Sequence, residues 1–265
     1  TLGMKTHYYI SPQIWAWKES RITEIKRDID KMYVILPFEK KFYEDKHHFP
    51  VEFVGHPLID AIYNQPIVDP VLFRKENQLN DKPIIAVLPG SRKQEITKML
   101  AVMLSVVNDF PDHQFVIAGA PSQEFSFYQK FITQENIKFI SNKTYDLLRN
   151  ATAALVTSGT ATLETALFKV PEVVCYKGSW ASYQIAKRII TLKYISLVNL
   201  IMDEEVVTEL IQEECNTKRI REELQKTLKT NDRNTLLEKY ALLEEKLGGI
   251  GASEKTATLI VNDLK

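Results

Sequence analysis

Apolar and polar residues alternate in blocks along positions 81–202, and the blocks predict strands and helices in turn. Short apolar runs of strand length are separated by longer segments in which apolar residues recur every three or four positions. Parallel strands need such helical crossovers, so the pattern predicts an α/β fold with a parallel sheet. The predicted strands cover residues 84–88, 114–118, 137–140, 153–156, 173–176 and 194–200, and the predicted helices cover 95–109, 123–134, 145–150, 163–169 and 181–192.

The two ends of the chain carry different patterns. Residues 1–57 hold two or three strand–helix units, fewer than a complete doubly wound domain contains. The segment GHPLID interrupts this pattern and places a boundary near Gly55. Residues 204–265 are predicted to be helical, with a glycine-rich break before a last helix that Ser253 caps. The predicted strands at the two ends are 7–11, 32–36 and 51–54. Helical spacing is predicted over 14–29, and helices at 38–45, 205–216, 218–229, 231–247 and 254–264.

The predicted organisation is therefore one complete Rossmann-like parallel-sheet domain, part of a second, and a helical C-terminus. We place the partial N-terminal domain at 1–57, the complete domain at 58–249, and a separate C-terminal helix at 250–265.

Composition narrows the class of protein. The 265 residues contain 34 Lys and Arg against 34 Asp and Glu, so no net charge draws the chain to nucleic acid or to anionic lipid. Two cysteines, Cys175 and Cys215, are too few for a disulfide framework or a zinc cluster and suit a reducing compartment. No apolar run approaches the roughly 18 residues that span a bilayer, and no signal peptide is visible.

The most informative stretch is ATAALVTSGTATLETALFKVP, residues 151–171. An apolar run, a small polar loop and a helical pattern predict a strand, a tight turn and a helix. The start of a helix exposes unpaired backbone N–H groups and the positive end of the helix dipole, which together favour phosphate. The predicted anion site consists of Ser158, Gly159, Thr160 and Ala161.

Glu164 lies one turn into this helix, on the same face as Thr160. A capping box does not explain it, because that motif needs the acid three residues after the cap, at Ala161 or Leu163. Simple complementarity to the helix dipole remains an alternative. The functional interpretation places a diphosphate on the turn and a ribose diol on Glu164.

A second turn, LPGSRKQE at 88–95, follows the first strand of the alternating region. Its Gly90 and Ser91 bring the backbone to the carboxyl end of the sheet, where ligands of open α/β sheets bind. Arg92 adds a planar cation suited to phosphate oxygens, unless it pairs on the surface with Glu95. The sequence lacks both the P-loop and the GxGxxG fingerprint, so neither a P-loop hydrolase nor an NAD enzyme is indicated.

Two further strand ends complete the predicted site. The strand that ends at Ile140 is placed to meet a base ring through backbone groups. Asn199, in SLVNL, would reach a hydroxyl or phosphate, with the alternative that it only ends a strand. We see no Asp-x-Asp pair or His/carboxylate cluster that is arranged for Mg²⁺ or Mn²⁺, so we expect neither a metal nor a cofactor. His56 and His113 are expected to be structural.

Six motifs in order resemble the lipid-A-disaccharide synthase family and extend over nearly the whole chain. They are YYISPQIWAWKESR, LPFEKKFY, FVGHPLID, LPGSR, SGTATLE, and a last one that runs from AKRIITLKYISLVNL to ELIQEEC. The resemblance implies a two-Rossmann-domain (GT-B) glycosyltransferase that inverts the anomeric centre without a metal. It implies transfer of 2,3-diacylglucosamine from its UDP derivative to 2,3-diacylglucosamine 1-phosphate, which yields the β-1,6-linked lipid A disaccharide 1-phosphate and UDP.

The resemblance also implies roles for single residues. Arg92 and the SGTAT turn would take the diphosphate, Glu164 the ribose, and Asn199 the sugar–diphosphate junction. The family begins with a Gly-rich strand and loop that are not present before Thr1, so we expect the general base to lie in that part and this chain to be inactive alone. We also expect the last helix to cross back to the N-terminal domain.

The substrates imply a cytoplasmic protein with peripheral contact to the inner face of the inner membrane, no nucleic-acid partner, and a possible homodimer. The alternatives are a UDP-N-acetylglucosamine 2-epimerase or another UDP-sugar enzyme of the same architecture, a non-catalytic UDP-binding module, and a structural interaction protein.

Overall fold

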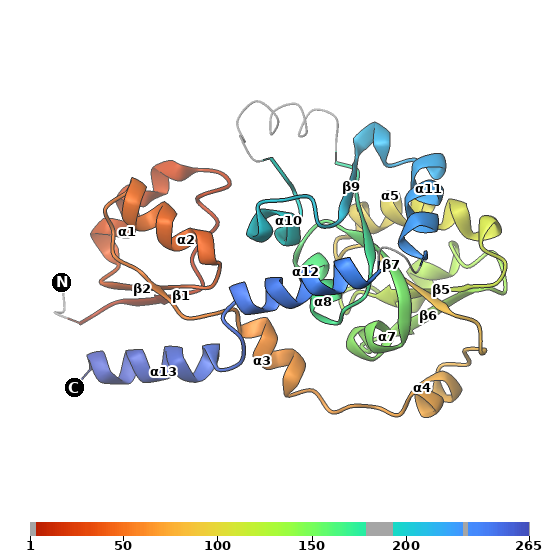
Figure 1. The fold of residues 1–265 in the computed structure, drawn as a ribbon, viewed down its shortest axis with the longest axis horizontal. Coiled ribbons are helices and arrows are strands. Elements are labelled where there is room, and N and C mark those ends of the chain that lie inside the picture. Colours follow the sequence, from red (N-terminus) through yellow and green to blue (C-terminus); the bar gives the residue numbers. More distant parts are fainter. Residues whose placement is uncertain (1–3, 179–192, 230–232, 265) are drawn as a thin grey trace. The chain divides into compact units, whose positions relative to one another are not determined.

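The computed structural model describes residues 4–178, 193–229 and 233–264 of the chain (Figure 1). These residues fall into two compact units. The first holds residues 4–65 and 241–264, and the second holds residues 66–178, 193–229 and 233–240. In the described part of the chain, no helix has both the length and the apolar character needed to cross a membrane.

The first unit contains a small parallel sheet with the strand order β1-β2-β3. Its core gathers apolar residues of β2 and of the helical segments on either side of it in the chain, including Ile25, Met32, Val34 and Tyr43. The strands predicted at 7–11, 32–36 and 51–54 are confirmed, with shorter bounds. The elements are β1 His7–Tyr9, η1 Glu19–Arg21, α1 Ile22–Asp28, β2 Lys31–Val34, α2 Pro37–Lys41, the π-helical turn η2 Phe42–Lys46, β3 Glu52–Phe53, α3 Pro57–Tyr63, and α13 Ala252–Asp263.

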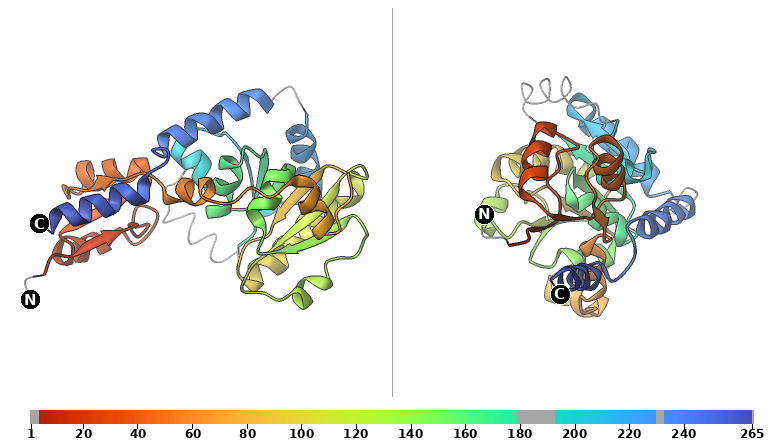
Figure 2. Two further views of the ribbon diagram at one scale, coloured as in Figure 1. Left: turned by 90° about the horizontal axis from the view of Figure 1, so that it is seen from below. Right: turned by 90° about the vertical axis from the view of Figure 1, so that its left-hand side faces the viewer.

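The C-terminal helix α13 belongs to this first unit and runs beside its strands (Figure 2). Lys255 Nζ donates to the carbonyl of Phe53 (2.8 Å), and Lys5 Nζ to that of Asp263 (2.8 Å). The sequence predicted Ser253 as the N-cap of this helix. That prediction is wrong, because the helix begins directly after Gly251. The carboxylate of Asp60 instead accepts from the N–H groups of Gly251 (2.6 Å) and Ser253 (2.8 Å).

The division into units differs from the predicted boundaries at 57/58 and 249/250. Residues 58–65 and 241–249 group with the first unit. One contact that joins these segments is the hydrogen bond from His56 N–H to the Leu247 carbonyl (2.9 Å). His56 itself is buried and its Nδ1 accepts from Leu58 N–H (3.2 Å), a capping role for α3.

In the second unit, six of the described strands form a parallel sheet with the order β6-β5-β4-β7-β8-β9. The chain moves outward from β4 through β5 to β6 and then returns to β7 on the other side of β4. The strand order therefore reverses between β4 and β7. The strands are β4 Ile84–Leu88, β5 Gln114–Gly119, β6 Ile137–Ser141, β7 Ala151–Thr157, β8 Glu172–Tyr176 and β9 Thr208–Ile211.

Both faces of this sheet are covered, as the continuous apolar strands predict. Alternate residues of β4, Ile85 and Val87, pack with α5, η3 and α11, whereas Ala86 and Leu88 pack with α4 and α7 on the other face. The helices of this unit are α4 Pro70–Glu76, α5 Lys93–Met103, η3 Leu104–Asp109, α6 Phe125–Gln129, α7 Thr144–Asn150, α8 Thr160–Leu167, α10 Leu197–Met202, η4 Gln212–Glu214, α11 Thr217–Thr227 and α12 Arg233–Lys246, of which residues 241–246 are grouped with the first unit.

Two predictions between residues 194 and 216 are wrong. No strand forms at 194–200, where helix α10 begins at Leu197, and the expected helix at 205–216 contains strand β9 and the short turn η4. The predicted helix at 123–134 is reduced to α6. The predicted helix at 181–192 lies outside the described residues.

Candidate functional site

The second unit contains a cavity of about 500 Å³ at the carboxyl ends of β4 and β7. These are the two strands between which the strand order reverses, the place where open α/β sheets bind ligands. Two turns supply most of the wall, the β4–α5 turn and the β7–α8 turn. The lining consists of Leu88, Pro89, Gly90, Ser91, Arg92, Glu95, Ala118, Gly119, Ala120, Pro121, Thr144, Thr157, Ser158, Gly159, Thr160, Ala161 and Glu164.

The structure thus brings together the two turns that the sequence placed in one site. All of the predicted site residues line this cavity except Ile140 and Asn199. The convergence follows from strand pairing, because Leu88 of β4 lies in register with Val156 of β7. Ligand binding by these residues stays a prediction.

The β7–α8 turn leaves the start of α8 open. Gly159 precedes the helix, no side chain caps it, and a Cβ built on Gly159 would meet nothing within 4 Å. Ser158 contributes less than expected, because its N–H donates to the Cys175 carbonyl (3.1 Å) and its hydroxyl to the Ile195 carbonyl (3.0 Å). In the described part of the chain, the N–H groups of Gly159, Thr160 and Ala161 have no partner, so they are available to an anion.

The β4–α5 turn is partly closed by its own helix. One carboxylate oxygen of Glu95 accepts from Ser91 N–H (3.2 Å) and lies against Gly90, where a Cβ would approach it to 2.2 Å. Gly90 has φ +97°, a conformation that favours glycine. The alternative in which Glu95 pairs with Arg92 is therefore not what the structure shows. Arg92 is exposed, and its guanidinium has no hydrogen-bond or ion-pair partner among the described residues.

Glu164 is half-buried in the wall of the cavity and is joined to helix α7. Its Oε1 accepts a hydrogen bond from the phenol of Tyr145 (3.2 Å). Burial raises the pKa of Glu164, and the hydrogen bond from Tyr145 opposes that rise. Burial and the neighbouring carboxylate raise the pKa of Tyr145 to about 12. Complementarity to the helix dipole alone does not account for a carboxylate held in this way.

Thr157 adds a polar group that the sequence did not suggest. It is the last residue of β7, it is 3% exposed, and it lines the cavity. In the described structure its hydroxyl is buried without a hydrogen-bond partner. Because buried hydroxyls are normally satisfied, this one fits a bound water or a polar atom of a ligand.

Asn199 is displaced from the site that the sequence assigned to it. It lies in helix α10 and not at a strand end, it is 0% exposed, and it does not line the cavity. Its Nδ2 donates to the Val207 carbonyl (2.8 Å) and to Glu209 Oε1 (2.9 Å). Its Oδ1 accepts from the N–H groups of Val206 (2.8 Å) and Val207 (3.0 Å). All four hydrogen-bonding positions of the amide are occupied, so in this structure Asn199 holds the segment after α10 against the start of β9.

Ile140 also lies outside the lining. Its side chain is 3% exposed and packs in the core between β6 and α7. Its neighbour in the adjacent strand is Ala118, which does line the cavity. A contact with a base through backbone groups near this strand end remains a prediction.

Several lining residues were missed for an identifiable reason. Ala118 and Gly119 end β5, and Ala120 and Pro121 follow it. The carboxyl end of β5 must lie beside that of β4 once the two strands pair in parallel. The glycine and proline after this predicted strand were the available signal. Thr144 precedes Tyr145 at the start of α7, and nothing in its sequence context distinguished it.

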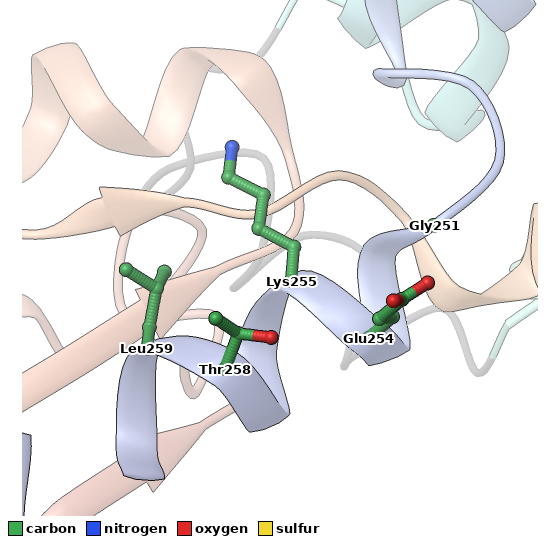
Figure 3. A pocket seen from close by; sticks show the side chains of 5 residues that line it. All are labelled: Gly251, Glu254, Lys255, Thr258 and Leu259. Carbon is green, nitrogen blue, oxygen red and sulfur yellow. The ribbon is translucent and has the colours of Figure 1, made fainter. Parts of the chain in front are cut away.

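A second hollow, of about 340 Å³, lies on the surface of α13 in the first unit. Figure 3 shows that its five lining residues all come from this helix and the glycine before it, with the Lys255 side chain extending away from the helix. The lining residues are Gly251, Glu254, Lys255, Thr258 and Leu259. Since separate chain segments do not converge on it, it is a weaker candidate than the cavity at β4 and β7. In the part of the chain that the structure describes, no cluster of His, Cys, Asp or Glu has the size to hold a metal ion.

Comparison with known proteins agrees with this architecture. In searches of solved structures, the chain is similar to WaaG, a glycosyltransferase involved in lipopolysaccharide biosynthesis (TM-score 0.54, 15% identity, 96% of this chain and 74% of that chain). It is also similar to S. aureus MnaA solved with UDP (TM-score 0.59, 14% identity, 96% and 65%). At these identities the likeness shows the fold, which is the GT-B-like α/β fold that the sequence predicted.

Closer relatives exist among curated sequences. Lipid-A-disaccharide synthase of Idiomarina loihiensis is 37% identical over 272 residues, which cover 97% of this chain and 69% of the relative. The enzyme of the same name from Coxiella burnetii is 38% identical over 270 residues, 98% of this chain and 70% of the relative. The family model described as Lipid-A-disaccharide synthetase matches residues 1–259. The chain therefore belongs to the lipid-A-disaccharide synthase family.

Proposed function

We propose that the second unit binds the UDP part of a UDP-sugar donor, and that the chain serves the transfer of 2,3-diacylglucosamine from UDP-2,3-diacylglucosamine to 2,3-diacylglucosamine 1-phosphate. The products are the β-1,6-linked lipid A disaccharide 1-phosphate and UDP. The observation that carries the proposal is the convergence of Arg92 and the open start of α8 on one cavity, in a chain of this family.

In this proposal the protein stabilises the leaving group. The acceptor hydroxyl attacks the anomeric carbon, and the bond from that carbon to the β-phosphate oxygen breaks with inversion. Negative charge develops on the β-phosphate, where Arg92 and the N–H groups of Gly159, Thr160 and Ala161 are positioned to meet it. The ribose hydroxyls lie on Glu164. The general base that accepts the proton of the acceptor hydroxyl is not assigned to any residue of this chain.

A first experiment is calorimetric titration of the 265-residue chain with UDP, in buffer containing EDTA. Binding that is unchanged by EDTA supports a diphosphate held by Arg92 and backbone groups. The donor specificity is tested by competition of UDP-2,3-diacylglucosamine against UDP-N-acetylglucosamine, followed by product analysis with the acceptor present. Absence of UDP binding contradicts the whole proposal. Epimerisation of UDP-N-acetylglucosamine supports the rival UDP-N-acetylglucosamine 2-epimerase. Binding without turnover agrees with the expectation that this chain is inactive alone and acts as a UDP-binding module.

The acylated substrates also lead us to propose peripheral contact with the inner face of the inner membrane. Sedimentation of the chain with vesicles that contain the acylated donor, compared with vesicles that lack it, tests this part separately. Homodimer formation stays a prediction, which sedimentation equilibrium of the chain tests directly.

A further inference from the structure

A hydrogen bond joins helices α7 and α8 at Glu164, the cavity-lining carboxylate that is proposed to hold the ribose. Tyr145 Oη lies 3.2 Å from Glu164 Oε1, and Thr144, the residue before Tyr145, lines the same cavity. The phenol approaches from a different helix than the one that carries the carboxylate. It therefore limits the rotation of the Glu164 side chain from outside the helix.

The tyrosine is itself held in place. Its ring packs on that of Phe168, with centroids 5.1 Å apart. On the Phe168 ring also lies the guanidinium of Arg149, whose central carbon is 5.4 Å from the ring centroid. Glu164 and Phe168 are four residues apart and lie on the same side of α8. Tyr145 thus contacts both through one side chain, its hydroxyl on the carboxylate and its ring on the aromatic ring.

This arrangement leaves the carboxylate able to accept further hydrogen bonds. An ionised carboxylate has about four acceptor positions on its two oxygens, and the phenol uses one on Oε1. Because the pKa of Tyr145 is raised to about 12, the phenol remains a donor throughout the neutral range. Glu164 Oε2 has no partner among the described residues, so it is the oxygen available to a ligand hydroxyl.

We propose that Tyr145 is a positioning residue, whose phenol fixes the Glu164 carboxylate in the orientation that accepts the ribose hydroxyls of a nucleoside diphosphate. The inference rests on the proposed function of the cavity. It adds that discrimination between a ribose and a sugar without its hydroxyls depends on a residue outside helix α8. The alternative is a purely structural role, in which Tyr145 only joins α7 to α8.

The experiment compares two ligands, UDP and 2′,3′-dideoxy-UDP, by calorimetric titration of the 265-residue chain. The wild-type chain is expected to bind UDP about 10- to 100-fold more tightly, because the hydroxyls donate to a charged acceptor. Tyr145→Phe is expected to reduce this ratio by about 3- to 10-fold, while affinity for the dideoxy ligand is retained. Binding of the dideoxy ligand also shows that the variant is folded.

Two controls sharpen the result. Tyr63→Phe removes the same kind of tyrosine–glutamate hydrogen bond elsewhere, since Tyr63 Oη donates to Glu244 Oε1 (2.8 Å), and is expected to leave the ratio unchanged. In a Glu164→Ala background, Tyr145→Phe is expected to have no further effect on the ratio, as required if the phenol acts through the carboxylate.

The possible failures are distinguishable. Equal losses for both ligands in Tyr145→Phe assign the residue a structural role and overturn the inference. Equal affinity of the wild-type chain for both ligands contradicts the contact between Glu164 and the ribose, and therefore the inference about Tyr145. It does not contradict the proposed diphosphate site. Failure of the wild-type chain to bind UDP at all contradicts the proposed function as well.

Discussion

The starts of helices α13 and α8 show two solutions to the same problem. Each helix begins after a glycine, without a side-chain cap of its own. At α13 the carboxylate of Asp60, from helix α3, accepts from two of the first N–H groups. At α8 no such group is present among the described residues, and the open end faces a cavity of about 500 Å³.

The difference separates a structural helix end from one that can take a ligand. The first N–H groups of a helix need an acceptor, and an internal carboxylate supplies one permanently. Where the protein provides no acceptor and leaves space, an external anion can serve. The β4–α5 turn is intermediate, because Glu95 takes the Ser91 N–H while Arg92 remains without a partner in the described structure.

We expect the largest effect from removing the Asp60 carboxylate that accepts hydrogen bonds at the start of helix α13. Asp60→Ala removes a buried acceptor from two N–H groups, so we expect the free energy of unfolding of the first unit to fall by about 2–3 kcal/mol. Urea denaturation followed by circular dichroism measures it. The matched control is Glu254→Ala, which removes an exposed acid in the first turn of the same helix and should cost less than about 1 kcal/mol.

The loss of stability caused by Asp60→Ala should depend on pH. Burial opposes ionisation of Asp60, but the hydrogen bonds from Gly251 and Ser253 outweigh it and hold its pKa below the ordinary value. A lowered folded-state pKa means that the stabilisation is fully present above the unfolded pKa of about 3.9 and is lost as pH falls through the folded-state value. The difference between wild type and Asp60→Ala should shrink below about pH 4. A difference that stays constant in acid excludes the charged cap.

At the open end, the main test is Arg92→Ala. Loss of a charged donor to a diphosphate should weaken UDP binding by about 10- to 100-fold, equivalent to roughly 1.5–3 kcal/mol. Isothermal titration calorimetry measures the change. Lys98→Ala removes one positive charge from the exposed side of α5, outside the cavity lining, and should leave the affinity within about twofold. Equal effects of the two substitutions would point to general electrostatic attraction.

A third test concerns the close contact between Gly90 and the Glu95 carboxylate in the β4–α5 turn. Gly90→Ala places a Cβ against the Glu95 carboxylate and forces an L-residue to φ +97°, so we expect a loss of about 1–3 kcal/mol in the free energy of unfolding. In a Glu95→Ala background the contact is absent and only the backbone strain, about 1 kcal/mol, should remain. Thermal denaturation of the four proteins closes the cycle, and additive losses would show that Glu95 plays no part.

The smallest expected effect is an increase in the affinity for UDP. Glu95→Gln keeps an acceptor for Ser91 N–H and removes one negative charge from the cavity wall, so UDP affinity should rise by about two- to threefold at low ionic strength. The gain should fade as salt is added. Glu124→Gln, an acidic residue outside the lining, should give no change. A loss of affinity in Glu95→Gln would mean that the charged carboxylate is needed to shape the turn.

Much of the fold was predictable because its signals are local. The alternation of apolar and helical blocks located β4 to β8, and the small polar loop at 158–161 located the start of α8. Between 194 and 216 the local signal misled. The apolar run SLVNLIM has the length of a strand but forms α10, whose residue Asn199 is satisfied by the backbone of Val206 and Val207. Strand β9 forms because it completes the sheet beside β8, which is a long-range pairing.

The sequence by itself determined the parallel α/β class, the two turns with phosphate-binding character, and the motifs of the family. Each depends on residues close together in the chain. Only the tertiary structure decided which groups meet. The pairing of β4 with β7 brought two turns about 70 residues apart to one edge, and the packing of α7 on α8 placed Tyr145 on Glu164. It also placed Asn199 outside the cavity lining, with its amide bonded to backbone groups of Val206 and Val207 and to the Glu209 side chain.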